Sequence, residues 1–154
     1  MKQYRFDDVE ALQELVSPDF GAWSAELEIT QELIDRFADL SGDDYWIHTD
    51  PERCKTQSPF GTTIAHGFLT LALLPKMKQQ PTYELTGYNN ILNYGSDKLR
   101  FTGAVPVGSR IHSRSRVKSV ERLPKGTRLT IETNVHVVGQ DRPALVSELV
   151  AIYM

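Results

Sequence analysis

The chain has 154 residues, of which 40% are hydrophobic and 24% charged, an ordinary composition for a globular protein. This length fits one domain spanning residues 1–154. The formal net charge of -3 argues against a nucleic-acid-binding surface. The longest apolar run, 67–74, is too short to cross a membrane, and residues 1–8 do not resemble a signal peptide. We therefore expect a cytoplasmic protein that binds neither nucleic acid nor membranes.

Helical patterns dominate the first half of the chain. Apolar spacing predicts a helix over residues 7–16 and an amphipathic helix over residues 31–40, which Thr30 is placed to cap. Between them, residues 22–29 alternate well enough to predict a strand. Residues 41–44, Ser-Gly-Asp-Asp, predict a turn that ends the second helix.

Two further helices are predicted after this turn. Asp50 is placed to cap a short helix that has Pro51 at its first position. Residues 67–74 are apolar on nearly every side, which predicts a helix that is buried all round.

Strand patterns dominate the second half. Residues 109–120, 128–137 and 144–153 are strand-like, and turn residues at 123–126 and 139–143 separate them at hairpin spacing. Helices followed by strands predict an α+β fold, with an antiparallel sheet wrapped around the central apolar helix. Because such a curved sheet leaves an open edge, we expect a homodimer that covers it.

A row of basic residues lies on one of these strands. Arg110, Arg114, Arg116 and Lys118 share one strand face. A solvated outer face is the favoured interpretation, and a surface for an anionic ligand is the alternative.

The only cysteine, Cys54, excludes a disulfide within the chain. No family signature that would mark a nucleophile surrounds it. The spacing of His, Asp and Cys offers no zinc pattern, so we expect neither a metal nor a cofactor.

Two features could perform chemistry. Asp43 and His48 lie five residues apart in a polar segment, and residues 60–67 lead into the apolar helix. The amide groups at a helix start lack partners within the helix, and a glycine such as Gly67 lets a substrate approach them closely. Each feature alone has a structural explanation, because Asp often caps a turn and His is often only structural. Together they indicate an acid–base site beside an oxyanion-binding pocket.

These segments resemble the R-specific enoyl-CoA hydratases, also called hydratase 2 or MaoC-like dehydratases. The resemblance covers roughly residues 23 to 120 and is greatest to the NodN-like branch. It rests on Gly42-Asp43, His48 and Ile64-Ala65-His66-Gly67, and on 50–53, 59–63, 92–95, 98–101 and 105–109. This chain has Tyr45-Trp46 where many hydratases have Asn-Pro, a bulkier pair that could narrow the pocket.

The resemblance implies a hot-dog fold and (R)-specific hydration of trans-2-enoyl-CoA, or the reverse dehydration. It implies that Asp43 is the base, that His48 positions water and exchanges a proton, and that the Gly67 N–H stabilises the enolate oxygen. Substrate contacts are then expected at Thr63, Ile64, His66, Asn93 and Arg100. His66 could orient the thioester, or it could simply cap the helix or pack. Asn93 and Arg100 could touch the thioester arm or form dimer contacts, and for both residues the structural role is favoured.

Two other functions remain open. A hot-dog thioesterase also uses a carboxylate but hydrolyses the thioester, whereas the Asp43–His48 pair with His66-Gly67 fits the hydratase pattern. A non-catalytic acyl-binding module would use the fold for association only.

Overall fold

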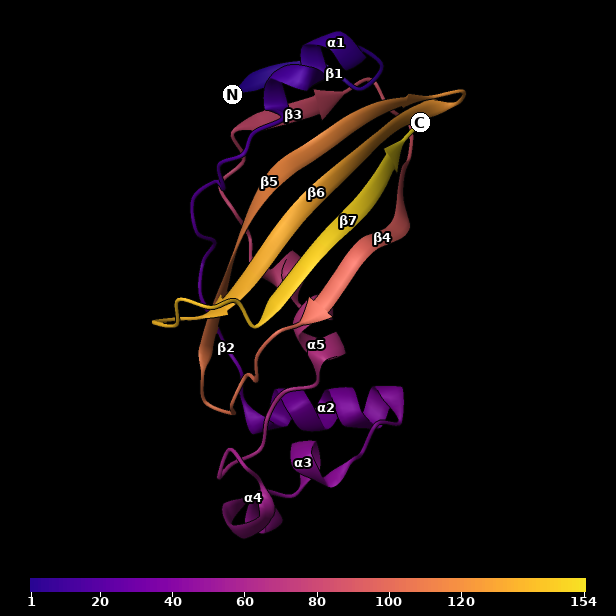
Figure 1. Cartoon of the computed structure of the whole chain (residues 1–154). Coiled ribbons are helices and arrows are strands. Elements are labelled where there is room, and N and C mark those ends of the chain that lie inside the picture. The colour runs from indigo at the N-terminus through magenta and orange to yellow at the C-terminus, as the bar shows by residue number, and fades with distance from the viewer.

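A five-stranded curved sheet organises the protein, and the computed structural model describes residues 1–154. The strands lie in the order β2-β5-β6-β7-β4, and every neighbouring pair is antiparallel. Their bounds are β2 Leu27–Glu28, β4 Ile91–Phe101, β5 Arg110–Leu123, β6 Gly126–Val137 and β7 Leu145–Tyr153. The sheet curls along its length (Figure 1), which confirms the predicted α+β hot-dog architecture.

Most of the other elements gather at the two ends of the sheet (Figure 1). The helices are α1 Val9–Leu12, α2 Gln31–Ser41, α3 Trp46–Thr49, α4 Pro51–Gln57 and α5 Gly67–Ala72, with 3-10 turns at Gln13–Leu15 and Leu74–Lys76. A parallel pair, β1 Lys2–Arg5 and β3 Tyr83–Thr86, lies with α1 at one end. Helices α2 to α4 lie at the other end, where the candidate site is found.

The predicted helix caps are confirmed. The Thr30 hydroxyl accepts a hydrogen bond from the Leu33 amide at 3.2 Å, and the Asp50 carboxylate accepts one from the Arg53 amide at 3.0 Å. Gly42 ends α2 with φ 79°, a left-handed conformation that glycine adopts without steric cost.

The N-terminal predictions need correction. The helix predicted over 7–16 begins only at Val9, and residues 2–5 form an unpredicted strand. The strand predicted over 22–29 is reduced to Leu27–Glu28, because the chain before it makes only isolated bonds to the edge of β5. One such bond joins the Ser24 amide to the Ser113 carbonyl at 2.8 Å.

Helix α5 is shorter and more open than its sequence predicts. It ends at Ala72, and Pro75 lies in the following 3-10 turn. Leu69 is 4% exposed, whereas Phe68 beside it is 61% exposed. The curled sheet packs around one side of this helix, so the prediction that the helix is buried on every side is wrong for the single chain. The sheet covers one side of the helix only, so the side that carries Phe68 faces outward.

The core has two parts that match the two ends of the sheet. The larger cluster packs α2 and α5 against the sheet and includes Ile34, Leu69 and Leu145. The smaller cluster packs α1, β1 and β3 against the other end and includes Leu12 and Leu129. Burial of these side chains therefore holds the helices of the candidate site against the sheet.

The basic row on β5 is largely neutralised by carboxylates. Arg110 pairs with Glu26, Arg116 with Glu132 and Lys118 with Glu148. The fourth member, Arg114, lies over the rings of Phe20 and Trp23 at 5.0 and 4.6 Å. These contacts favour the interpretation of the basic row as a structural outer face. They do not favour the alternative, a surface for an anionic ligand.

Strand β4 forms one edge of the sheet and is almost wholly exposed. Its exposed apolar side chains include Ile91, Leu92, Tyr94 and Phe101. No helix of the protein is long and apolar enough to span a membrane.

Candidate active site

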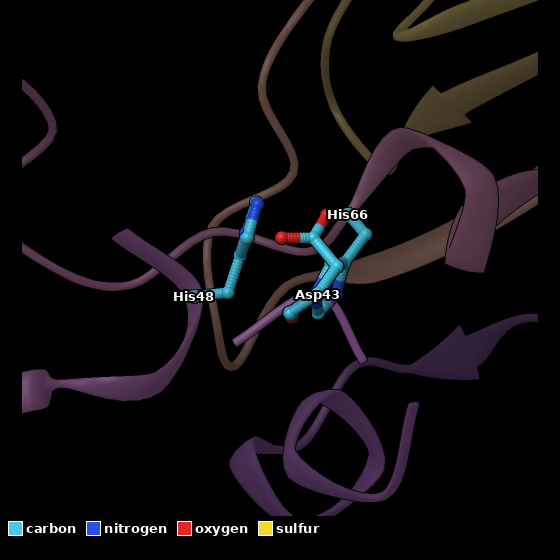
Figure 2. Close-up of side chains that lie close together, drawn as sticks. All are labelled: Asp43, His48 and His66. Atoms are coloured by element: carbon cyan, nitrogen blue, oxygen red, sulfur yellow. The ribbon is translucent and has the colours of Figure 1, made fainter. Parts of the chain in front are cut away.

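Three segments bring Asp43, His48 and His66 together. Asp43 follows α2, His48 lies in α3, and His66 directly precedes α5. One carboxylate oxygen of Asp43 and one ring nitrogen of each histidine all lie within 4.8 Å of one another. Figure 2 shows the three side chains close together, with the Asp43 carboxylate on the side of His48. The structure thus places the predicted acid–base pair side by side and adds His66 to it.

The loop that carries Asp43 is shaped by the end of α2. The left-handed turn at Gly42 reverses the chain, and the Asp43 amide donates to the Ser41 hydroxyl at 3.2 Å. The Asp43 residue is exposed, and its carboxylate accepts only a long contact of 3.5 Å from the Tyr45 amide. Most of its accepting capacity therefore remains available to a water or a substrate.

His48 is held in one tautomer by the backbone. Its Nδ1 lies 2.7 Å from the Ile64 carbonyl oxygen. Because a carbonyl can only accept, Nδ1 must carry the proton, and in the neutral ring Nε2 is left with a free lone pair. His48 can therefore accept a hydrogen bond at Nε2 beside the Asp43 carboxylate.

His66 is buried behind this pair, with 3% of its surface exposed. Its Nε2 donates to the Asp43 carbonyl at 2.8 Å. Its ring stacks on His48 at 3.9 Å between centroids and 24° between planes, and contacts the edge of Phe37 at 4.9 Å. His66 therefore fixes the backbone of one candidate catalytic residue and the ring of the other, which favours a positioning role over the substrate contact expected for it.

A fourth residue, Gln31, secures the same region from α2, and the sequence did not single it out. Its side-chain amide donates to the His48 carbonyl at 2.8 Å, and its oxygen accepts from the hydroxyl of Thr63. Thr63 is fully buried, so its hydroxyl is committed to Gln31 rather than exposed to substrate. Nothing in the sequence pattern marks Gln31, because its partners lie 17 and 32 residues away.

A pocket of about 360 Å³ opens beside His48. Ile64, Gly67, Thr70 and Phe101 are among its lining residues. The predicted residues His48, Ile64 and Gly67 thus share one cavity, which is mainly apolar as ligand pockets usually are.

Gly67 is required at its position by packing. A Cβ added there would lie 2.6 Å from the Phe101 ring, far inside van der Waals contact. The side chain of His66 makes no capping hydrogen bond to α5, so the first amide groups of the helix keep no partner from that side chain. With only six residues, α5 contributes these amide donors rather than a strong helix dipole.

Asn93 and Arg100 lie away from this group. Asn93 lines a different cavity of about 400 Å³ with Leu74 and Pro75, at the other end of α5. Arg100 is exposed on β4, and its guanidinium donates to the Leu99 carbonyl at 2.8 Å. The structure does not bring either residue to the Asp43–His48 pair, in keeping with the structural role that the sequence favours.

The Asp43, His48 and His66 side chains could offer one metal ligand each. However, metal-bound imidazoles aim lone pairs in the ring plane at one ion, whereas these two rings stack nearly in parallel at 3.9 Å. The arrangement is better suited to holding and transferring a proton. Cys54 is fully buried, and its thiol points at the Trp46 and Ile47 carbonyls. Burial raises the pKa of this thiol, which opposes a role as nucleophile.

Comparisons with known proteins identify a family and two relatives. Residues 22–139 match the family described as the MaoC like domain. The chain is 50% identical over 127 residues to 3-hydroxyacyl-thioester dehydratase Z of Mycobacterium tuberculosis, covering 82% of this chain and 83% of the relative. It is 38% identical over 154 residues to Nodulation protein N of Rhizobium meliloti, covering 99% and 92%.

A solved structure is also similar to this fold. The R-hydratase PhaJ1 of Pseudomonas aeruginosa, in its unliganded form, superposes with a TM-score of 0.67 at 26% identity. The match covers 88% of this chain and 81% of that structure.

Proposed function

Because the chain belongs to the MaoC-like dehydratase family, we propose that it hydrates trans-2-enoyl thioesters to (R)-3-hydroxyacyl thioesters and catalyses the reverse dehydration. Family membership supports the hydratase or dehydratase class. The preference for an enoyl-CoA substrate and the (R) product are the specific parts of the proposal. They are supported by the pairing of Asp43 with His48 and by similarity to proteins named as a dehydratase and an R-hydratase.

The proposed reaction begins with a water held by two acceptors. This water donates one of its hydrogens to the Asp43 carboxylate and the other to Nε2 of His48. As the water oxygen bonds to C3 of the enoyl group, a proton passes to Asp43, and the C2–C3 electron pair moves toward the thioester oxygen. The protonated Asp43 carboxyl then gives this proton to C2 from the same side, which restores the carboxylate and adds one water overall. Each of these acid–base groups is expected to contribute about 10²–10⁴-fold.

The thioester oxygen carries negative charge midway through this reaction. We place it against the Gly67 amide, because Gly67 and His48 line the same pocket. A donor fixed in advance stabilises that charge without rearranging during the step. The proposed chemistry uses only protein groups and water.

The single observation that carries the proposal is the bond between His48 Nδ1 and the Ile64 carbonyl at 2.7 Å. It leaves Nε2 as an acceptor on a residue that lies beside the Asp43 carboxylate and lines the same pocket as Gly67. A structural histidine buried in the core would not present a free nitrogen to a pocket.

Incubation of the protein with crotonyl-CoA tests this function. We expect the enoyl absorbance to fall without release of free thiol, and chiral analysis to identify (R)-3-hydroxybutyryl-CoA. Release of free thiol would instead identify a thioesterase. Binding of acyl-CoA without turnover would identify a non-catalytic acyl-binding module.

We further propose that two copies pair through β4. This edge strand leaves its outer backbone groups without partners in the single chain, and it exposes Ile91, Leu92 and Tyr94. An antiparallel pair of identical edges would satisfy both copies by the same contacts. Light scattering should then give about twice the chain mass of 17.4 kDa. A mass equal to one chain at micromolar concentration would refute the pairing.

A further inference from the structure

The pocket beside His48 continues past its rim. A second pocket of about 460 Å³ lies next to it and shares five of its lining residues. The shared residues are Phe60, Thr102, Gly103, Ala104 and Ala144. We call the two pockets together the arm channel. Three of the five shared positions are glycine or alanine, so small side chains form much of the boundary between the two pockets.

The arm channel has an uneven distribution of charge. Apart from His48, which lines the first pocket, Arg142 in the second pocket is the only lining residue with an ionisable side chain. Arg142 lies in the loop between β6 and β7 and is exposed. Its guanidinium makes no ion pair and no hydrogen bond within the protein, unlike Arg110 and Arg116 on β5. An unpaired cation at the end of a mostly apolar channel is suited to bind an anion.

We propose that Arg142 binds the phosphate of a 4′-phosphopantetheine arm, an inference that rests on the proposed function. An acyl thioester attached to this arm carries its reacting carbons at one end and its first charged group, the phosphate, at the other. With the thioester beside His48 and Gly67, the uncharged part of the arm crosses the shared wall near Gly103 and Ala104. The phosphate then emerges where Arg142 is free to form two parallel hydrogen bonds to it.

The same phosphate occurs in coenzyme A and on acyl carrier proteins, so the subsite recognises the chemistry that both share. The arm channel shows one free cation rather than a cluster, which matches a single phosphate group. Because Arg142 is exposed, its contribution should weaken as ionic strength rises.

Binding of the arm without an acyl group tests the subsite directly. Isothermal titration with 4′-phosphopantetheine and with pantetheine measures the preference for the phosphate. We expect the wild type to prefer the phosphorylated form by about tenfold in low salt, the size expected for a hydrogen bond to a charged group. Arg142→Gln should lose this preference while its affinity for pantetheine stays unchanged.

Lys125→Gln provides the matched control. Lys125 is an exposed cation in the β5–β6 turn, at the opposite end of the sheet from the β6–β7 loop (Figure 1). This variant loses the same charge and should keep the wild-type preference. A preference that persists in Arg142→Gln, or that disappears equally in Lys125→Gln, would overturn the assignment.

Kinetics then distinguish the two sources of the phosphate. In Arg142→Gln, KM should rise about tenfold with kcat unchanged for crotonyl-CoA, for a crotonyl carrier protein, or for both, and the substrate affected identifies the source. An unchanged KM for both substrates overturns the subsite even if hydration is confirmed. Conversely, an Arg142-dependent phosphate preference in a protein that hydrates no enoyl thioester would refute the proposed function and support the subsite.

Discussion

Asp43→Asn should lower kcat by about a hundredfold or more while the protein remains folded. The amide has nearly the shape of the carboxylate, but it cannot take the proton from the water. Asp43 is exposed, and its carboxylate forms no ion pair, so the substitution removes little stability. Since the water rather than the substrate is its proposed partner, KM should change little. Steady-state kinetics with crotonyl-CoA measure both constants.

Asp44→Asn is the matched control for this variant. Asp44 is the adjacent exposed carboxylate, and it lines a surface hollow with Asp35 and Asp39 and does not belong to the group that Asp43 forms with His48 and His66. Its turnover should stay close to that of the wild type. Near-normal turnover in a well-folded Asp43→Asn protein would remove Asp43 from the mechanism.

His48 variants extend the same test to the second acceptor. His48→Ala should lose activity to a similar extent, since it removes both the free nitrogen and the bond to the Ile64 carbonyl. His48→Gln should keep some activity, because its amide can hold the water without exchanging a proton. If His48→Ala instead unfolds the protein but the folded fraction retains high specific activity, the histidine is structural.

Leu69→Asp should prevent the protein from folding. Leu69 is 4% exposed and belongs to the larger core cluster with Ile34 and Leu145. Replacing it removes a packed side chain, a change that costs about 2–5 kcal/mol in comparable cores. An unpaired carboxylate in that place adds a penalty of about several kcal/mol. The sum is comparable to the whole stability of about 5–15 kcal/mol that is typical of a domain. Circular dichroism and the yield of soluble protein measure the outcome.

The neighbouring residue gives the control. Phe68 is 61% exposed, so Phe68→Asp places the same charge one residue away in water. This variant should fold. The Phe68 and Phe101 rings contact each other, with 5.2 Å between their centroids. If the partner subunit covers this pair, the variant should also weaken the proposed dimer. A folded Leu69→Asp protein would contradict the core assigned to α5.

The positions of most elements follow from local patterns that the sequence carries by itself. Alternating residues predicted β5, β6 and β7, and Thr30 and Asp50 marked the starts of α2 and α4, because caps and side-chain periods act over a few residues. The motif with Asp43 and His48 was equally visible. The family match and the similar solved structure confirm the family and the hot-dog fold that this motif predicted.

Only the tertiary structure decided how distant residues meet. It places His66 against the Asp43 carbonyl 23 residues away and leaves Arg142 unpaired at the end of the arm channel. It also leaves Phe68 exposed, although the apolar run predicts burial on every side. The physical reason is that periodicity shows which side chains avoid water, whereas the curvature of the sheet and the length of α5 determine which of them are covered.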